Sequence, residues 1–130
     1  MILLDTHIWV WWVHGDEHLS VHLKEVLRSH EPDGLGVSAI SCWEVSQLIA
    51  LGRVVLPCRV EDWTDQALAY PGIRLLPLTL EIAREANILP PGLGPDLADR
   101  LIVATARLEG ISLVTTDEHL LAYEHVVTVS

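Results

Sequence analysis

The chain has 130 residues, of which half are hydrophobic and a fifth are charged. This composition excludes a disordered or low-complexity chain, and the length predicts one domain over residues 1–130. The 8 basic and 18 acidic residues give a formal net charge of −10 at pH 7. A general polyanion-binding surface is therefore disfavoured, because phosphates would be repelled at long range.

The first residues do not resemble a targeting segment. No basic region precedes the apolar run Ile2-Leu3-Leu4, and the carboxylate of Asp5 follows it at once. The longest nearly uncharged stretch, residues 35–52, contains Glu44, three serines and Gln47, so we expect no transmembrane helix. These features predict a soluble, cytoplasmic protein without a membrane partner.

Short apolar runs alternate with amphipathic ones along the whole chain. In chain order, the pattern predicts a strand at 2–4, helices at 6–13 and 20–30, a strand at 35–37, helices at 41–51 and 60–68, a strand at 73–78, a helix at 79–88, a stiff loop at 90–95, a helix at 97–109, a strand at 111–114, a short helix after 117 and an edge strand at 125–129. Short strands that alternate with helices predict an α/β fold with a mostly parallel central sheet and helices on both faces.

Five acidic residues stand where the strands of such a sheet would end. Asp5 follows the first strand, and Asp117 follows the strand at 111–114. Glu44 lies in the first turn of the helix expected to begin at Ser41, and Asp96 and Asp99 open the helix at 97–109. Ligands of parallel sheets bind beyond the carboxyl ends of the strands, so we expect all five acids at one edge.

Each acid also has a structural explanation as a helix cap. Ser41-x-x-Glu44 matches a capping box, Asp96-x-x-Asp99 is similar to one, and Asp5 and Asp117 are placed to cap the helices that follow them. Capping does not explain why the acids converge, because their mutual repulsion costs stability. A cluster of carboxylates calls for a cation, and oxygen ligands favour Mg²⁺ or Mn²⁺ over zinc.

Four segments, in order along the chain, carry a family resemblance. The segments are Leu3-Leu4-Asp5-Thr6-His7, Ser38-Ala39-x-Ser41-x-Trp43-Glu44, Asp96-x-x-Asp99-Arg100-Leu101-Ile102-x-Ala104-x-Ala106 and Leu113-Val114-Thr115-Thr116-Asp117. Together they closely resemble the PIN domain, and the VapC-type toxin ribonucleases are the most similar branch. Each segment alone is weak, but four at matching separations are specific, and the resemblance spans nearly the whole chain.

The resemblance implies a three-layer α/β sandwich and a ribonuclease that hydrolyses RNA with Mg²⁺ or Mn²⁺. Asp5, Glu44 and Asp99 match the metal-binding acids of the family, Asp117 matches the fourth, and Asp96 matches an accessory acid. The family also implies a homodimer that a cognate antitoxin protein neutralises. Basic residues that the family often carries near its acids are replaced here by Gly94, Pro95 and Leu48, which removes possible phosphate contacts.

Two other protein classes of similar topology are excluded because residues that they need are missing. A phosphoaspartyl receiver needs an acidic pair after the first strand and a late lysine, but Leu4 precedes Asp5 and no lysine or arginine follows Arg107. A haloacid-dehalogenase-type phosphatase needs an aspartate where this chain has His7. A metal-free interaction module on the same fold stays open as the alternative function.

Two further groups of residues invite a functional interpretation. His14, His18 and His22 are four residues apart, but the helix start expected at Ser20 breaks their register, which argues against zinc. Trp9, Trp11 and Trp12 make the helix at 6–13 apolar almost all round. Such a helix is either fully buried or a surface for a partner or a second subunit.

Overall fold

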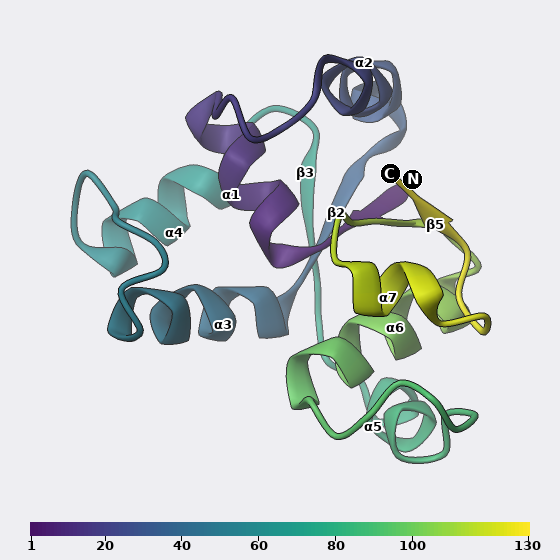
Figure 1. The fold of residues 1–130 in the computed structure, drawn as a ribbon. Coiled ribbons are helices and arrows are strands. Elements are labelled where there is room, and N and C mark those ends of the chain that lie inside the picture. Colours follow the sequence, from purple (N-terminus) through teal and green to yellow (C-terminus); the bar gives the residue numbers. More distant parts are fainter.

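The computed structural model describes residues 1–130, and a five-stranded sheet forms its centre (Figure 1). The strand order is β3-β2-β1-β4-β5, and every pairing is parallel, including that of the edge strand β5. The strands are β1 (Ile2–Leu4), β2 (Leu35–Ser38), β3 (Ile73–Leu76), β4 (Leu113–Val114) and β5 (Thr128–Val129). The direction in which strands are added reverses between β1 and β4, which is where ligands of such sheets bind.

Helices cover both faces of this sheet, which confirms the predicted three-layer architecture. One apolar cluster joins the sheet to α1, α2 and α4, and a second joins it to α5, α6 and α7. The helices are α1 (Thr6–His14), α2 (Val21–His30), α3 (Ala39–Ala50), α4 (Val60–Leu68), α5 (Leu80–Asn87), α6 (Leu97–Glu109) and α7 (Glu118–Ala122), with a short 3₁₀ turn at Glu31–Asp33. No helix has both the length and the hydropathy needed to span a membrane.

Strand β1 shows why the two layers form. Successive side chains of a strand point to opposite faces of the sheet. Because helices cover both faces here, all three residues of β1 are almost fully buried. Leu3 packs into the α5–α6 side, whereas Ile2 and Leu4 pack into the α1–α2 side. The apolar run before Asp5 therefore fixes both cores at once.

The start of α3 differs from the prediction. The helix begins at Ala39 directly after β2, and the Ser38 hydroxyl accepts a hydrogen bond from the Ile40 amide at 3.2 Å. Ser41 is not the cap; it is buried inside the helix and its hydroxyl lies 2.8 Å from that of Thr6. The capping box with Glu44 is therefore wrong, and Glu44 lies in the second turn of the helix.

Three strands are shorter than the sequence predicts. β3 ends at Leu76 rather than 78, β4 begins at Leu113 rather than 111, and β5 begins at Thr128 rather than 125. β4 pairs with β1 through Leu113 and Val114 only, and the same two residues pair with β5.

The tryptophans of α1 are divided between core and surface. Trp9 is completely buried, packs 4.9 Å from the ring of Trp63, and donates to the Ala67 carbonyl at 3.3 Å. Trp63 donates in turn to Nε2 of His14 at 2.8 Å. Trp11 and Trp12 are only partly buried. The helix is thus neither wholly buried nor wholly a surface element.

Candidate functional site

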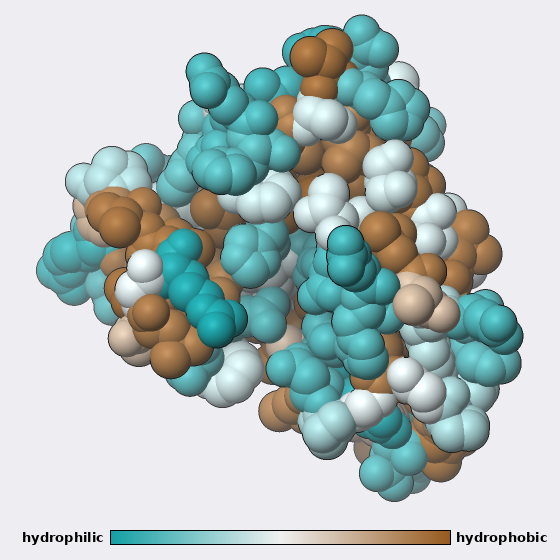
Figure 2. Space-filling model, in the orientation of Figure 1, coloured by the Kyte–Doolittle hydropathy of each residue, from teal (hydrophilic) through white to brown (hydrophobic).

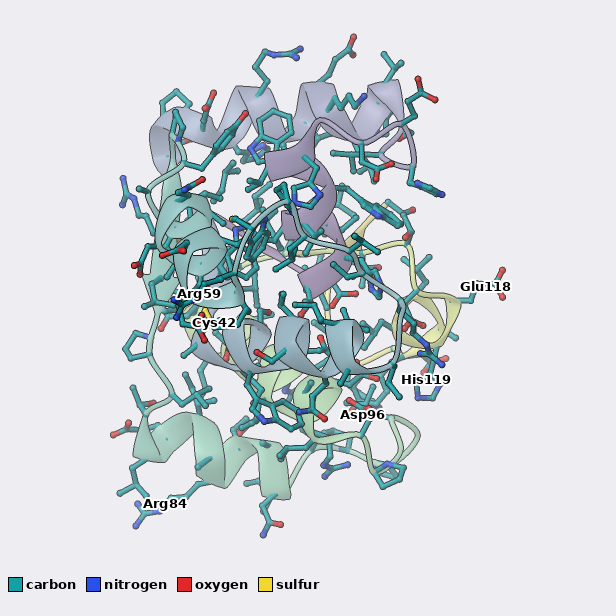
Figure 3. The ribbon with its side chains drawn as sticks, turned by 90° about the vertical axis from the view of Figure 1, so that its left-hand side faces the viewer. Cys42, Arg59, Arg84, Asp96, Glu118 and His119 are labelled. Carbon is teal, nitrogen blue, oxygen red and sulfur yellow. The ribbon has the colours of Figure 1, made fainter.

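The five predicted acids gather at the carboxyl edge of the sheet. Asp5 follows β1, Asp117 follows β4, Glu44 lies on α3, and Asp96 and Asp99 begin α6. The carboxylates of the other four all raise the pKa of Asp99 through their negative charge. Figure 3 shows Asp96 and His119 on the same side of the molecule. The structure therefore brings together the residues that the sequence singles out.

Asp5 is the most buried of these acids, and the protein holds both of its oxygens. Oδ1 accepts a hydrogen bond from the Thr6 amide and Oδ2 accepts one from the Thr115 hydroxyl, each at 2.8 Å. Burial raises the pKa of Asp5, while these two hydrogen bonds oppose the rise. The orientation of the carboxylate is consequently fixed before any ligand binds.

Asp117 is tied to Asp5 through Thr115. The Thr115 hydroxyl accepts a hydrogen bond from the Asp117 amide at 3.0 Å while it donates to Asp5. The side chain of Asp117 accepts from the His119 amide at 2.8 Å and so caps α7. One buried hydroxyl thus sets the spacing of the two acids that follow neighbouring strands. The sequence shows a threonine at this strand end, but nothing local marks it as the link.

Asp99 and Glu44 lack such support. No protein group donates a hydrogen bond to the Asp99 carboxylate, and burial together with its acidic neighbours raises its pKa to about 7. Burial also raises the pKa of Glu44, with contributions from Asp5 and Asp96. The nearby Thr6 hydroxyl opposes that rise, although its oxygen is also paired with Ser41. Few hydrogen bonds from the protein therefore offset the repulsion between these carboxylates and their acidic neighbours.

Three of the acids do act as helix caps, as the sequence predicts. Asp5 accepts from the Thr6 amide, Asp96 accepts from the Asp99 amide at 2.9 Å, and Asp117 caps α7. For Asp96 and Asp117 capping and metal binding are compatible, because one carboxylate oxygen caps while no hydrogen bond engages the other. For Asp5 the second oxygen is also engaged, by the Thr115 hydroxyl.

No salt bridge neutralises any of the five acids. The three salt bridges of the chain are His18–Asp16, Arg59–Glu61 and Arg107–Glu85. The sequence suggests no role for His7 beyond packing. In the structure it lies close enough to Asp5 and Glu44 for its charge to oppose the rise in both pKa values. The acidic edge is therefore short of positive charge, which is the condition that a bound cation relieves.

The donor set suits a hard divalent cation. All five side chains offer carboxylate oxygens, the ligands preferred by Mg²⁺ and Mn²⁺. As the side chains are placed, no three acidic, histidine or cysteine groups lie close enough to hold one ion among them. The Asp99 carboxylate accepts no hydrogen bond and that of Glu44 has only the Thr6 hydroxyl nearby, so both can turn toward an ion, whereas Asp5 is already fixed. The chemistry of the site fits a metal, and its geometry requires these two side chains to move.

The proline-rich loop beside the acids is pinned from three directions. The Tyr123 hydroxyl donates to the Pro90 carbonyl at 2.6 Å, and His119 contacts the Leu93 carbonyl. Arg100 donates to the Gly94 carbonyl at 2.8 Å and to that of Ala86 at 3.0 Å. Because Arg100 is engaged in holding the loop, it offers less to a phosphate than its position next to Asp99 suggests.

Comparison with known proteins places the chain among relatives of known type. The chain is 35% identical over 124 residues to Ribonuclease VapC22 of Mycobacterium tuberculosis, which covers 95% of this chain and 92% of that protein. The fold is similar to that of VapBC2 from Rickettsia felis bound to a promoter DNA fragment, with a TM-score of 0.72, 16% identity and coverage of 99% and 98% of the two chains. It is also similar to FitAcB from Neisseria gonorrhoeae, with a TM-score of 0.71, 21% identity and coverage of 100% and 97%.

A family comparison covers almost the whole chain. The family model described as the PIN domain matches residues 2–126, a range that contains every strand except β5 and all five acids of the sheet edge. Nucleases of this family are generally dependent on divalent metal ions. On this match, and on the identity over most of its length to a VapC ribonuclease, the chain belongs to the PIN domain family.

Proposed function

We propose that this chain is an endoribonuclease that uses Mg²⁺ or Mn²⁺ to hydrolyse RNA phosphodiester bonds, and that it acts in the cytoplasm as the toxin of a toxin–antitoxin pair. The carrying observation is the gathering of five carboxylates at one sheet edge without a neutralising salt bridge. The identity to a protein named as a ribonuclease supports the substrate. In this proposal residues 1–130 act as one PIN-type unit.

Asp5, Glu44, Asp99 and Asp117 hold one or two ions in this proposal, with Asp96 beside them. Magnesium suits such a site, because it keeps several waters and needs only a few carboxylates together with phosphate oxygens. When bound, the ion lowers the pKa of a water and neutralises charge that develops on the phosphate and the leaving oxygen.

The side chains contribute by orientation and by charge. Asp5 is held rigidly by Thr6 and Thr115, so it offers a fixed point from which the site is built. Asp99 exchanges a proton near neutral pH, because its pKa is raised to about 7, and cation binding replaces that proton. Water rather than the ribose 2′-hydroxyl attacks, so the products carry a 5′-phosphate and a 3′-hydroxyl.

The partner we propose is an antitoxin whose basic residue reaches the acidic edge, with the toxin itself as a homodimer. A net charge of −10 and an edge of unpaired carboxylates complement such a partner electrostatically. Similar folds occur in a toxin–antitoxin complex from Klebsiella pneumoniae and in VapBC2 from Rickettsia felis, which supports an antitoxin as the partner of this chain.

The alternative is an interaction module that keeps the PIN fold without catalysis. Its support is the placement of the acids, no three of which converge on one ion position as they stand. The two functions differ in one measurable respect, because only the enzyme requires a metal for turnover.

The test is cleavage of a long single-stranded RNA in Mn²⁺, in EDTA, and in EDTA followed by excess Mn²⁺. We expect cleavage, no cleavage and restored cleavage, with 3′-hydroxyl ends that a ligase accepts. Asp65→Asn removes an exposed acid of α4 outside the acidic edge and serves as the matched control, with activity equal to that of the parent. Cleavage that persists in EDTA removes the metal, whereas a folded chain inactive in all three conditions supports the interaction module.

A further inference from the structure

A row of three aromatic rings begins beside the acidic edge and runs along α1. The ring centroids of His7 and Trp11 are 5.7 Å apart, and those of Trp11 and His18 are 5.4 Å apart with planes only 18° from parallel. His7 follows Asp5 by two residues, in the first turn of α1. Figure 1 shows α1 leading from the end of β1 toward α2 and away from α6 and α7. The row therefore extends from the acids in a single direction.

The outer ring of this row is fixed in place and open to solvent. Asp16 Oδ1 lies 2.6 Å from Nδ1 of His18 and accepts a hydrogen bond from the His18 amide at 2.8 Å. Gly15, at a φ of 62°, turns the chain at the end of α1, and the Asp16 amide donates to the Trp11 carbonyl at 2.9 Å. The His18 side chain is nevertheless 74% exposed. One surface of the ring rests on Trp11 and the rest faces water.

Positive charge that could hold a phosphate chain is scarce beside the acids. Arg100 is engaged with two loop carbonyls. Figure 3 shows Arg59 and Arg84 on the side of the molecule away from Asp96. Figure 2 shows hydrophilic residues along the middle of the face between the α3–α4 side and the α6–α7 side, so no broad apolar groove guides a ligand there. Stacking of bases on aromatic rings needs no charge and tolerates every base.

We propose that the exposed face of His18, held against Trp11 at the outer end of the row, stacks on a base of single-stranded RNA and so positions the phosphodiester at the acidic edge. The inference rests on the proposed function and adds to it the residues that position the RNA. A duplex keeps its bases stacked inside and cannot offer them to the row. Trp11 is the central positioning residue, because it contacts both of the other rings.

The test measures RNA binding separately from cleavage. In the Asp5→Asn background with Mn²⁺, which keeps the RNA intact, the probes are a labelled oligouridine, an abasic strand of equal length, and a duplex. We expect Trp11→Leu to weaken oligouridine binding roughly tenfold, and Trp11→Phe to retain most of it. The abasic strand binds weakly and equally to all variants, and the duplex binds no better than the abasic strand. Tyr70→Leu is the matched control, since it removes an exposed aromatic ring outside the row and leaves binding unchanged.

In the active chain, Trp11→Leu is expected to raise KM by the same factor and to leave kcat within about twofold. A thermal melt establishes that each variant is folded. Equal losses for oligouridine and the abasic strand, or a Trp11→Leu variant that matches Tyr70→Leu, would overturn the inference. So would a Trp11→Leu variant that loses a protein partner but keeps RNA binding. If the parent binds bases through Trp11 but never cuts RNA, the proposed function fails while the stacking row stands.

Discussion

The two halves of the acidic edge are built differently. Asp5 and Asp117, which follow neighbouring strands, are linked through the Thr115 hydroxyl and also accept hydrogen bonds from backbone amides. Glu44 and Asp99, which lie on helices, receive almost no hydrogen bonds and have raised pKa values. Both pairs carry the same functional group, so the contrast arises only from what surrounds each carboxylate.

This contrast suggests a division of labour within one site. The strand-end pair is oriented by the protein and needs no cation to hold its place. The helix pair is repelled by its neighbours and gains most when a cation arrives. Without metal, only the strand-end carboxylates are held in fixed positions. The electrostatic repulsion among the acids therefore destabilises the folded chain less than it would if all of them were fixed.

The rigid half gives the largest expected effect on activity. Asp5→Asn removes a full negative charge from the best-oriented ligand, so we expect RNA cleavage to fall by roughly a hundredfold or more. The amide oxygen can still accept the Thr6 hydrogen bond, and the cost of burying a charge disappears. The melting temperature should therefore stay within a few degrees of the parent. An Asp5→Asn variant with parental activity would show that this half is structural only.

The adaptable half gives an effect on stability that depends on pH. The pKa of Asp99 is about 7 in the folded chain and near 3.8 in the unfolded one. In chelator, the unfolded chain releases this proton first as the pH rises, so stability falls between about pH 4 and pH 7 and then levels off. Asp99→Asn removes this loss.

Unfolding by urea in EDTA tests the expectation. At pH 8 the Asp99→Asn variant should be more stable by about 1 kcal/mol, a modest gain because water screens the partly exposed carboxylate. At pH 4 the two proteins should be equal. Added Mn²⁺ should stabilise the parent and not the variant, which reverses their order. A variant less stable than the parent at pH 8 in EDTA would mean that Asp99 has a favourable partner after all.

Asp96 gives the smallest expected effect on activity, and its substitution tests whether it belongs to the metal-binding acids or only caps α6. Its Oδ1 caps α6, and asparagine caps a helix about as well as aspartate does. We expect Asp96→Asn to keep activity within about threefold and stability within about 0.5 kcal/mol, whereas Asp96→Ala loses about 1 kcal/mol with the cap. Chemical denaturation and RNA cleavage of the two variants separate capping from catalysis. A large loss of activity in Asp96→Asn would move this acid into the metal-binding group.

The sequence alone was sufficient wherever the deciding contacts are local. The apolar run before Asp5 predicts a doubly buried strand, and the caps at Ser20, Thr79, Asp96 and Asp117 all bond to amides two or three residues onward. A cap depends on its neighbours in the chain, so composition and spacing reveal it. The edge that gathers the five acids follows in the same way, from the order of strands and helices.

The tertiary structure decided what depends on distant partners. Ser38 rather than Ser41 begins α3, because the Ser41 hydroxyl is turned inward to Thr6. The Thr115 hydroxyl bonds to Asp5 across 110 residues of sequence and so links it to Asp117, and the ladder between β4 and β5 contains only two residue pairs. The raised pKa of Asp99 arises from burial, from the adjacent Asp96 and from acids on three distant segments, and the aromatic row arises from a turn that returns His18 to Trp11. Desolvation and long-range pairing exist only once the chain has folded, so no pattern of neighbouring residues could reveal them.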